Sequence, residues 1–199
     1  MSKVRDQTFQ IVRYADAPTL AETACMTFAP FADDVARLSQ RAVAAGLDQG
    51  EHLRVLISMP GFSLTHVWFK KHYPLPLHSH DADCLYYIIA GSLRIGNETL
   101  GPRDGFFIPA DMPYAYIPGD DGVELLEFRH STHFTFVNHA NGSAFWNKAI
   151  QTAQANVEDW RSAKRPVLSD GDGNGNKNGK GNGNGKAANR KGTKTGNGE

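Results

Sequence analysis

A succession of short β-prone runs fills the middle of the chain and restricts its fold more than any other feature. The runs are rich in β-branched and aromatic residues, and glycine-containing turn signals separate them. We expect strands at residues 53–58, 63–71, 84–90, 93–95, 98–100, 105–108, 114–117, 123–128 and 133–137. The turns are expected at Gly91-Ser92, Gly96-Asn97, Gly101-Pro102 and Gly119-Asp120-Asp121-Gly122. Many short strands without intervening helices predict an all-β sandwich or barrel.

Helical periodicity flanks this β region on both sides. Residues 30–46 begin at Pro30, end at Gly46 and carry an apolar stripe. Residues 143–163 repeat apolar side chains at helical spacing, with Trp146 and Trp160 on the stripe. We therefore predict an N-terminal arm and packing helix, a β barrel, a C-terminal helix and a tail, with boundaries at 1–52, 53–140, 141–166 and 167–199. The tail is rich in Gly, Asn and Lys, so we expect it to be disordered.

Composition narrows the classes of partner. Lys and Arg together number 21, as do Asp and Glu, so bulk charge predicts neither a nucleic-acid nor a membrane partner. The two cysteines, Cys25 and Cys84, do not make a disulfide framework. The N-terminal residues lack the apolar region of a secretion signal, and no apolar run approaches the length of a membrane span. We expect a cytoplasmic protein.

The sequence His78-Ser79-His80 indicates a metal site. Alternate residues of a strand point to the same face, so the two histidines would project together, about 6–7 Å apart along the strand. Two imidazoles side by side are a common first half of a metal site. The further ligands remain open, because the sequence offers several candidates: Cys84, Tyr114, Asp83, His66, His72, His130 and His133.

Aromatic residues offer a second kind of site. Tyr86 shares a strand face with Cys84, and Tyr114 shares one with Tyr116. We predict a small pocket with phenol groups at its polar points, lined by Trp68, Tyr86, Phe107, Tyr114 and Tyr116. The alternative is that these side chains are ordinary core residues with satisfied hydroxyls.

The stretch from residue 60 to about residue 130 resembles the cupin family. The family's first motif places two histidines, a glutamate and a glycine in a fixed frame, and His78, His80 and Gly91 fall on it. Asp104 and Pro109 fall on the second motif. This chain departs from the pattern at four positions: Cys84 replaces the glutamate, Tyr114 the second-motif histidine, and Arg103 and Asp111 two glycines.

The resemblance implies a double-sheet jelly-roll barrel with flanking helices, a divalent metal ion and a homodimer. Fe(II) is favoured, with Mn, Ni or Zn as alternatives, held by His78 and His80 with help from Cys84, His66 or His130. Asp104 is expected to order the turn before the strand 105–108. Tyr86 and Tyr114 are the predicted catalytic residues, as proton donors or acceptors.

Three functional hypotheses follow. The first is a metal-dependent enzyme that oxidises a small organic molecule in a dioxygenase-like reaction, with a lyase or isomerase reaction as a close rival. The second is a non-catalytic module that binds a small ligand or senses a metal. The third is a metal-free isomerase or epimerase that uses a histidine–tyrosine acid–base pair.

Overall fold

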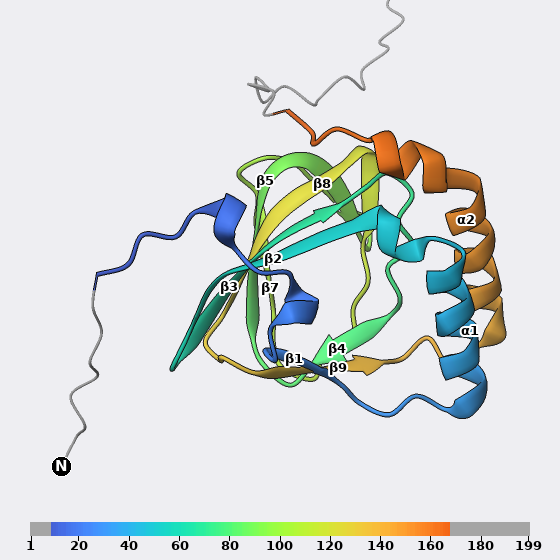
Figure 1. The fold of residues 1–199 in the computed structure, drawn as a ribbon, viewed down its shortest axis with the longest axis horizontal. Helices are drawn as coiled ribbons and strands as arrows, with labels where there is room; N and C mark the ends of the chain where they lie inside the picture. Colours follow the sequence, from blue (N-terminus) through green and yellow to red (C-terminus); the bar gives the residue numbers. More distant parts are fainter. Residues whose placement is uncertain (1–8, 168–199) are drawn as a thin grey trace, which may run out of the picture. The chain divides into compact units, whose positions relative to one another are not determined.

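The computed structural model describes residues 9–167, which form two β-sheets and a pair of helices (Figure 1). The strands are β1 (Met26–Phe28), β2 (Glu51–Met59), β3 (Phe62–Phe69), β4 (His78–His80), β5 (Cys84–Ile95), β6 (Glu98–Leu100), β7 (Gly105–Ile108), β8 (Ile117–Arg129) and β9 (Phe134–Asn138). The α-helices are α1 (Asp33–Ala44) and α2 (Ser143–Ser162). Short 3₁₀ helices are η1 (Tyr14–Asp16), η2 (Leu20–Glu22) and η3 (Leu47–Gly50).

The larger sheet has the strand order β2-β3-β8-β5-β6, and β7 pairs with β5. All of these pairings are antiparallel. The prediction of turns at Gly91-Ser92 and at residues 119–122 is wrong, because β5 and β8 run through both stretches without a break. The predicted strands 84–90 and 93–95 are one strand, and the predicted strand 123–128 begins at Ile117.

Close contact between two backbones explains the misleading glycines. Gly91 and Gly122 have φ angles of 71° and 79°, in the left-handed region that favours glycine. A β-carbon on Gly91 would lie 2.2 Å from the carbonyl oxygen of Gly122. The pairing of β5 with β8 shifts register between Gly91 and Leu93. These glycines therefore mark a bulge where two strands approach closely, rather than chain reversals.

The smaller sheet has the order β1-β9-β4. β1 pairs with β9 in parallel, and β4 pairs with β9 antiparallel. The N-terminal region thus supplies β1 as an edge strand of this sheet. The two sheets and the flanking helices confirm the predicted all-β jelly-roll class.

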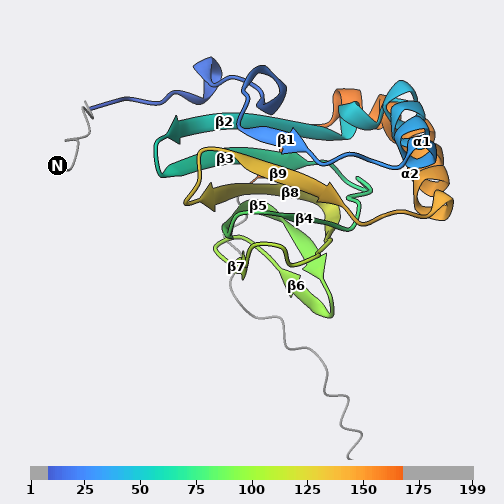
Figure 2. The same ribbon diagram turned by 90° about the horizontal axis from the view of Figure 1, so that it is seen from below.

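The helices α1 and α2 lie side by side at one end of the strands (Figures 1 and 2). The predicted apolar stripe of α2 is confirmed, because Trp146, Ile150 and Trp160 are buried. The Trp160 indole donates to the carbonyl of Lys71 over 2.8 Å, which fixes the helix to the segment that leads into β4. The helix therefore packs on the core and fixes the segment that precedes β4. None of the helices in residues 9–167 has the length and apolar character to cross a membrane.

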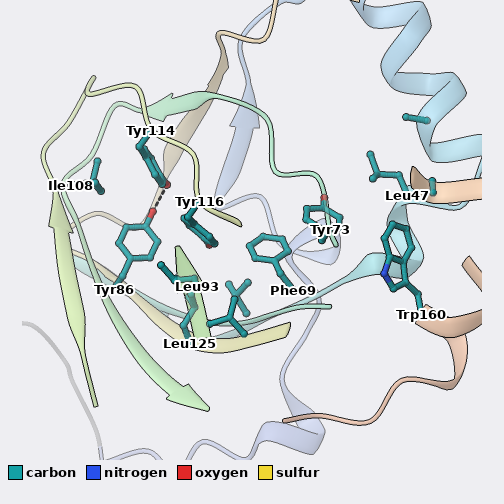
Figure 3. Close-up of a cluster of buried hydrophobic side chains, with 14 of the residues drawn as sticks. Leu47, Phe69, Tyr73, Tyr86, Leu93, Ile108, Tyr114, Tyr116, Leu125 and Trp160 are labelled. Carbon is teal, nitrogen blue, oxygen red and sulfur yellow. Dashed lines mark hydrogen bonds between the residues drawn. The ribbon is translucent and has the colours of Figure 1, made fainter. Parts of the chain in front are cut away.

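The core lies between the sheets and is lined by alternating residues of β3, β5 and β8 (Figure 3). Val67 and Phe69 of β3 face it, as do Tyr86 of β5 and Leu125 of β8. The same alternation continues toward the end of β8 and brings two charged residues, Glu127 and Arg129, to the buried face. The interior is therefore apolar at one end and polar at the other. The expected tail lies almost entirely outside the described residues, which end at Val167.

Candidate functional site

His78 and His80 lie on β4, a strand of three residues that is held on both sides. β9 pairs with β4 on one side, placing His80 opposite Phe136. Tyr114 forms an isolated bridge with His78 on the other side, through backbone hydrogen bonds of 3.1 and 2.8 Å. Both imidazoles are buried, and their ring centres are 5.1 Å apart in an edge-on arrangement. The structure thus brings the predicted histidine pair together on one face.

The hydrogen bonds of the two imidazoles fix their tautomers. Nδ1 of His78 lies 2.8 Å from the carbonyl oxygen of Pro76, and Nδ1 of His80 lies 3.1 Å from that of Thr135. A carbonyl oxygen only accepts, so both Nδ1 atoms carry hydrogen. Each Nε2 atom therefore holds a lone pair, and the hydrogen bonds that hold the two rings run through Nδ1. This is the tautomer in which histidine binds a metal through Nε2.

Burial keeps both histidines neutral at physiological pH. It lowers the pKa of His78 to about 4, and burial with the nearby Arg129 charge lowers the pKa of His80 to about 3. Aromatic rings from β9 cover them: Phe136 stacks on His78 with ring centres 4.8 Å apart, and Phe134 meets His80 edge-on at 5.2 Å. Two neutral imidazoles with free lone pairs are therefore enclosed in an apolar setting.

Tyr86, Tyr114 and Tyr116 lie close together in the core (Figure 3). The hydroxyl groups of Tyr86 and Tyr114 share a hydrogen bond, and the Tyr114 ring centre lies 4.3 Å from that of His78. Burial, followed by the Glu127 charge, raises the pKa of both phenols above the usual value. Tyr116 is also buried, with its ring 6.4 Å from that of Tyr86. The Tyr114 ring therefore adjoins His78, and Tyr86 is linked to it through the shared hydroxyl hydrogen bond.

A buried ion pair completes the site, and the sequence reasoning missed it. Arg129 Nη1 donates to Glu127 over 2.8 Å, and the guanidinium lies 4.0 Å from the centre of the Phe134 ring. Arg129 is only 1% exposed. Burial opposes its charge, but the adjacent Glu127 carboxylate raises its pKa above the usual value. The period-two pattern of Val123, Leu125, Glu127 and Arg129 was the available signal, provided that the strand extended to residue 129.

Cys84 is the first residue of β5 and lies in register with Arg129, the last residue of β8. It is buried, and burial raises the pKa of its thiol to about 12. The thiol of the metal-free protein is therefore protonated at neutral pH. Cys25 is also buried and free, but it packs in a different cluster from Cys84.

The two histidines fit a divalent ion, but they supply only part of a ligand set. The ring centres of two imidazoles on one ion lie roughly 4.5–5.5 Å apart, for metal–nitrogen bonds of about 2.0–2.1 Å. The observed 5.1 Å agrees with this. Within residues 9–167, no group of three or more His, Cys, Asp or Glu side chains lies close enough to hold an ion. An ion bound here would take its remaining ligands from outside the chain or from a phenol.

Four other predicted site residues lie elsewhere. His66 and Trp68 alternate with the inward residues of β3 and face the outside of the sheet, where His66 Nε2 lies 2.6 Å from Glu124. Trp68 borders a surface hollow of about 840 Å³ that also touches Trp160 and Arg165. His130 is exposed, and Phe107 is 57% exposed on the outer face of β7. The structure does not bring these four to the histidine pair.

Two residues in the loops near the site, Arg103 and Asp111, have an uncommon backbone conformation. Arg103 and Asp111 occupy positions where the motif has glycine, and their φ angles are 76° and 62°. Such angles are uncommon for residues with a side chain. Asp104, between them in the motif, accepts a hydrogen bond of 2.8 Å from the Gly101 amide and orders the turn as expected. The chain has a cupin-like fold.

Comparisons with known proteins find solved structures that are similar to less than half of this chain. No family model matches the sequence, and a sequence search of curated proteins finds no match. An RmlC-like cupin from Shewanella frigidimarina is 19% identical over 41% of this chain and 76% of its own, with a TM-score of 0.37. KdgF from Halomonas sp. is 17% identical over 41% of this chain and 81% of its own, with a TM-score of 0.37.

Oxalate decarboxylase from Bacillus subtilis is also similar. It is 20% identical over 42% of this chain but only 26% of its own, with a TM-score of 0.38. That decarboxylase has Mn(II) centres. Likeness at these identities and TM-scores says nothing about the activity of the present chain, which must be argued from its own residues.

Proposed function

We propose that this protein is a metal-dependent cupin enzyme that acts on a small organic molecule. Dioxygenase-like oxidation is the reaction class that we favour, with Fe(II) as the preferred ion. The supporting observation is the pair of neutral imidazoles, His78 and His80, whose tautomers leave both Nε2 lone pairs available. Imidazole nitrogen suits iron, zinc, nickel and copper among the biological metals.

The side chains around the pair have separate roles in this proposal. A divalent ion held by His78 and His80 supplies Lewis acidity and, if it is iron, redox capacity. Phe134 and Phe136 cover the imidazoles and exclude water. The hydroxyl pair of Tyr86 and Tyr114 holds protons beside His78, and one of these phenols donates to, or accepts from, the bound molecule.

Metal content tests the proposal directly. We expect protein purified without chelator to carry near-stoichiometric iron, manganese, nickel or zinc, measured by elemental analysis. The double variant His78→Ala/His80→Ala should lose this metal. The matched control is His130→Ala/His133→Ala, which removes two exposed histidines and should keep it. Absence of metal in the wild type, before and after reconstitution, would refute the proposal.

A second candidate is a metal-free isomerase or epimerase. The observation that favours it is the contact between Tyr114 and His78, which places a phenol donor beside a neutral imidazole base. Such a pair exchanges a proton next to a carbonyl group without a metal. We expect chelated protein to catalyse deuterium exchange into small carbonyl compounds, followed by NMR, and Tyr114→Phe to abolish it. Ligand binding without exchange or oxygen uptake would instead indicate a non-catalytic module.

A further inference from the structure

Two buried hydrogen-bond donors at the polar end of the interior lack acceptors. Arg129 is 1% exposed and Thr65 is 1% exposed. Within residues 9–167, neither Arg129 Nε nor Thr65 Oγ1 has a hydrogen-bond partner. Buried polar groups in native proteins are almost always satisfied, so two orphaned donors near each other require an explanation.

Both donors face the interior that contains the histidine pair. Thr65 lies opposite Glu127 on β8, and Ser63, two residues earlier on the same face of β3, lies opposite Arg129. The two donors are therefore diagonal neighbours on adjacent strands. Arg129 also interacts electrostatically with Cys84, Tyr86 and both interior histidines. The orphaned donors belong to the proposed site rather than to a separate one.

The charges around the site favour an anionic group. Glu127 accepts from Nη1 of Arg129 and leaves the Nε edge of the guanidinium without an acceptor. The two histidines are neutral, and the opposite charges of Arg129 and Glu127 cancel, so these four side chains carry no net charge. Arg129 Nε–H and the Thr65 hydroxyl are both donors, and a carboxylate supplies two acceptor oxygens together with a negative charge that pairs with a guanidinium.

We propose that Arg129 and Thr65 recognise a carboxylate group of the substrate. This inference rests on the proposed function, because it assigns the substrate class of the same site. One carboxylate oxygen accepts from Arg129 Nε–H, and the Thr65 hydroxyl donates to the same group. The aromatic wall of Tyr86, Tyr114 and Phe134 surrounds the apolar body of the molecule. The substrate class is therefore small monocarboxylates with a compact apolar part.

Binding to chelated, metal-free full-length protein separates this inference from the metal proposal. The probes are acetate and benzoate, each compared with its neutral amide, acetamide or benzamide, by isothermal calorimetry and thermal shift at constant ionic strength. We expect at least one carboxylate to bind at least tenfold more tightly than its amide. Arg129→Met should abolish this preference, whereas Arg94→Met, at an exposed arginine, should keep it.

Thr65→Val provides the test if Arg129→Met fails to fold once Glu127 loses its partner. The substitution is nearly isosteric and removes an unpaired hydroxyl, so we expect ligand-free protein to be at least as stable as the wild type. Its affinity for the carboxylate should fall about three- to tenfold. Equal affinity for acid and amide in the wild type, or unchanged affinity in Thr65→Val, would overturn the inference, whatever the metal analysis shows.

Discussion

At the scale of the residue, Arg103 and Asp111 retain a backbone conformation that their side chains disfavour. The left-handed region costs an L-residue roughly 1–2 kcal/mol, and less for Asp, whose short side chain tolerates it. The Asp111 amide donates to the carbonyl of His80 over 2.7 Å, and the Arg103 amide donates to that of Ile88 over 3.0 Å. Both turns therefore bond to the strands that carry the site, and their conformation is maintained despite the strain.

We expect Arg103→Gly to stabilise the protein by roughly 0.5–1 kcal/mol, because glycine adopts a positive φ without a steric penalty. Urea denaturation measures the change in the free energy of unfolding. Arg94→Gly is the matched control, since Arg94 is exposed in the extended strand β5 and should lose stability on the same substitution. A loss of stability in Arg103→Gly comparable to that of the control would contradict the strain argument.

The hydroxyl pair gives a second prediction at this scale. Removing one phenol leaves the other buried and unpaired, which costs about 1–3 kcal/mol. We therefore expect Tyr86→Phe and Tyr114→Phe each to lower the free energy of unfolding, and the double variant to lose less than the sum. Thermal or urea unfolding supplies the double-mutant cycle. Tyr87→Phe, at an exposed tyrosine on the same strand, should change stability little. Additive losses would exclude coupling between the two hydroxyls.

At the scale of the element, a hydrogen bond between two side chains connects the start of β2 to the segment before β4. The Tyr73 hydroxyl donates to the carboxylate of Glu51. Burial raises the pKa of Glu51 from 4.5 to about 7, although the tyrosine hydrogen bond opposes this rise. The folded protein therefore holds this proton more tightly than the unfolded chain does, and the associated stability is lost as the pH rises through 7.

We expect this carboxyl to lower the free energy of unfolding by about 1–3 kcal/mol between pH 5 and pH 8, because one pKa unit corresponds to about 1.4 kcal/mol. Glu51→Gln keeps a hydrogen-bond acceptor for Tyr73 and cannot titrate, so its loss over this range should be smaller by that amount. Urea denaturation at the two pH values makes the comparison. Parallel pH profiles for wild type and variant would show that Glu51 has an ordinary pKa.

Which elements were predictable depends on how local their signals are. The β2–β3 hairpin and both helices carry their patterns within a few adjacent residues, and the prediction placed them well. The long strand β8 was cut short because Gly119-Asp120-Asp121-Gly122 has the composition of a turn. Its glycines are explained only by contact with distant backbones: a β-carbon on Gly122 would lie 2.6 Å from the carbonyl oxygen of Phe69.

In the candidate site, too, the features with a local sequence signal were predicted and those that depend on distant contacts were not. The histidine pair was visible because the alternation of a strand is local. The Arg129–Glu127 pair was not recognised, because its inward orientation requires β8 to continue past Phe128 and β9 to cover it. The outward orientation of His66 was likewise hidden, since the period-two pattern separates two faces without saying which one is inside.

At the scale of the whole molecule, the outer face of the larger sheet exposes a contiguous apolar patch. Leu85 lies opposite both Phe107 and Phe128, and these side chains are 50%, 57% and 44% exposed. Contiguous exposed apolar surface of this kind often marks an interface. We propose that this face meets the same face of a second copy, because a two-fold interface brings identical patches together.

We expect a homodimer at micromolar concentration, measured by sedimentation equilibrium. Phe107→Glu or Phe128→Glu should shift the protein to a monomer, because each would bury a charge in the interface. Val43→Glu, at an exposed position on α1, should leave the association unchanged. A monomeric wild type would refute the proposed interface without affecting the site.

The smaller sheet has a consequence for how the protein is made. β9 is the last strand among residues 9–167, and both β1 and β4 pair with it. On the ribosome, the strand with the two histidines emerges well before the strand that closes over it. Until β9 emerges, the nascent chain carries β1 and β4 as open hydrogen-bonding edges, which are the kind of surface that aggregates or recruits chaperones. The enclosure of the two imidazoles is therefore one of the last events in the biosynthesis of the domain.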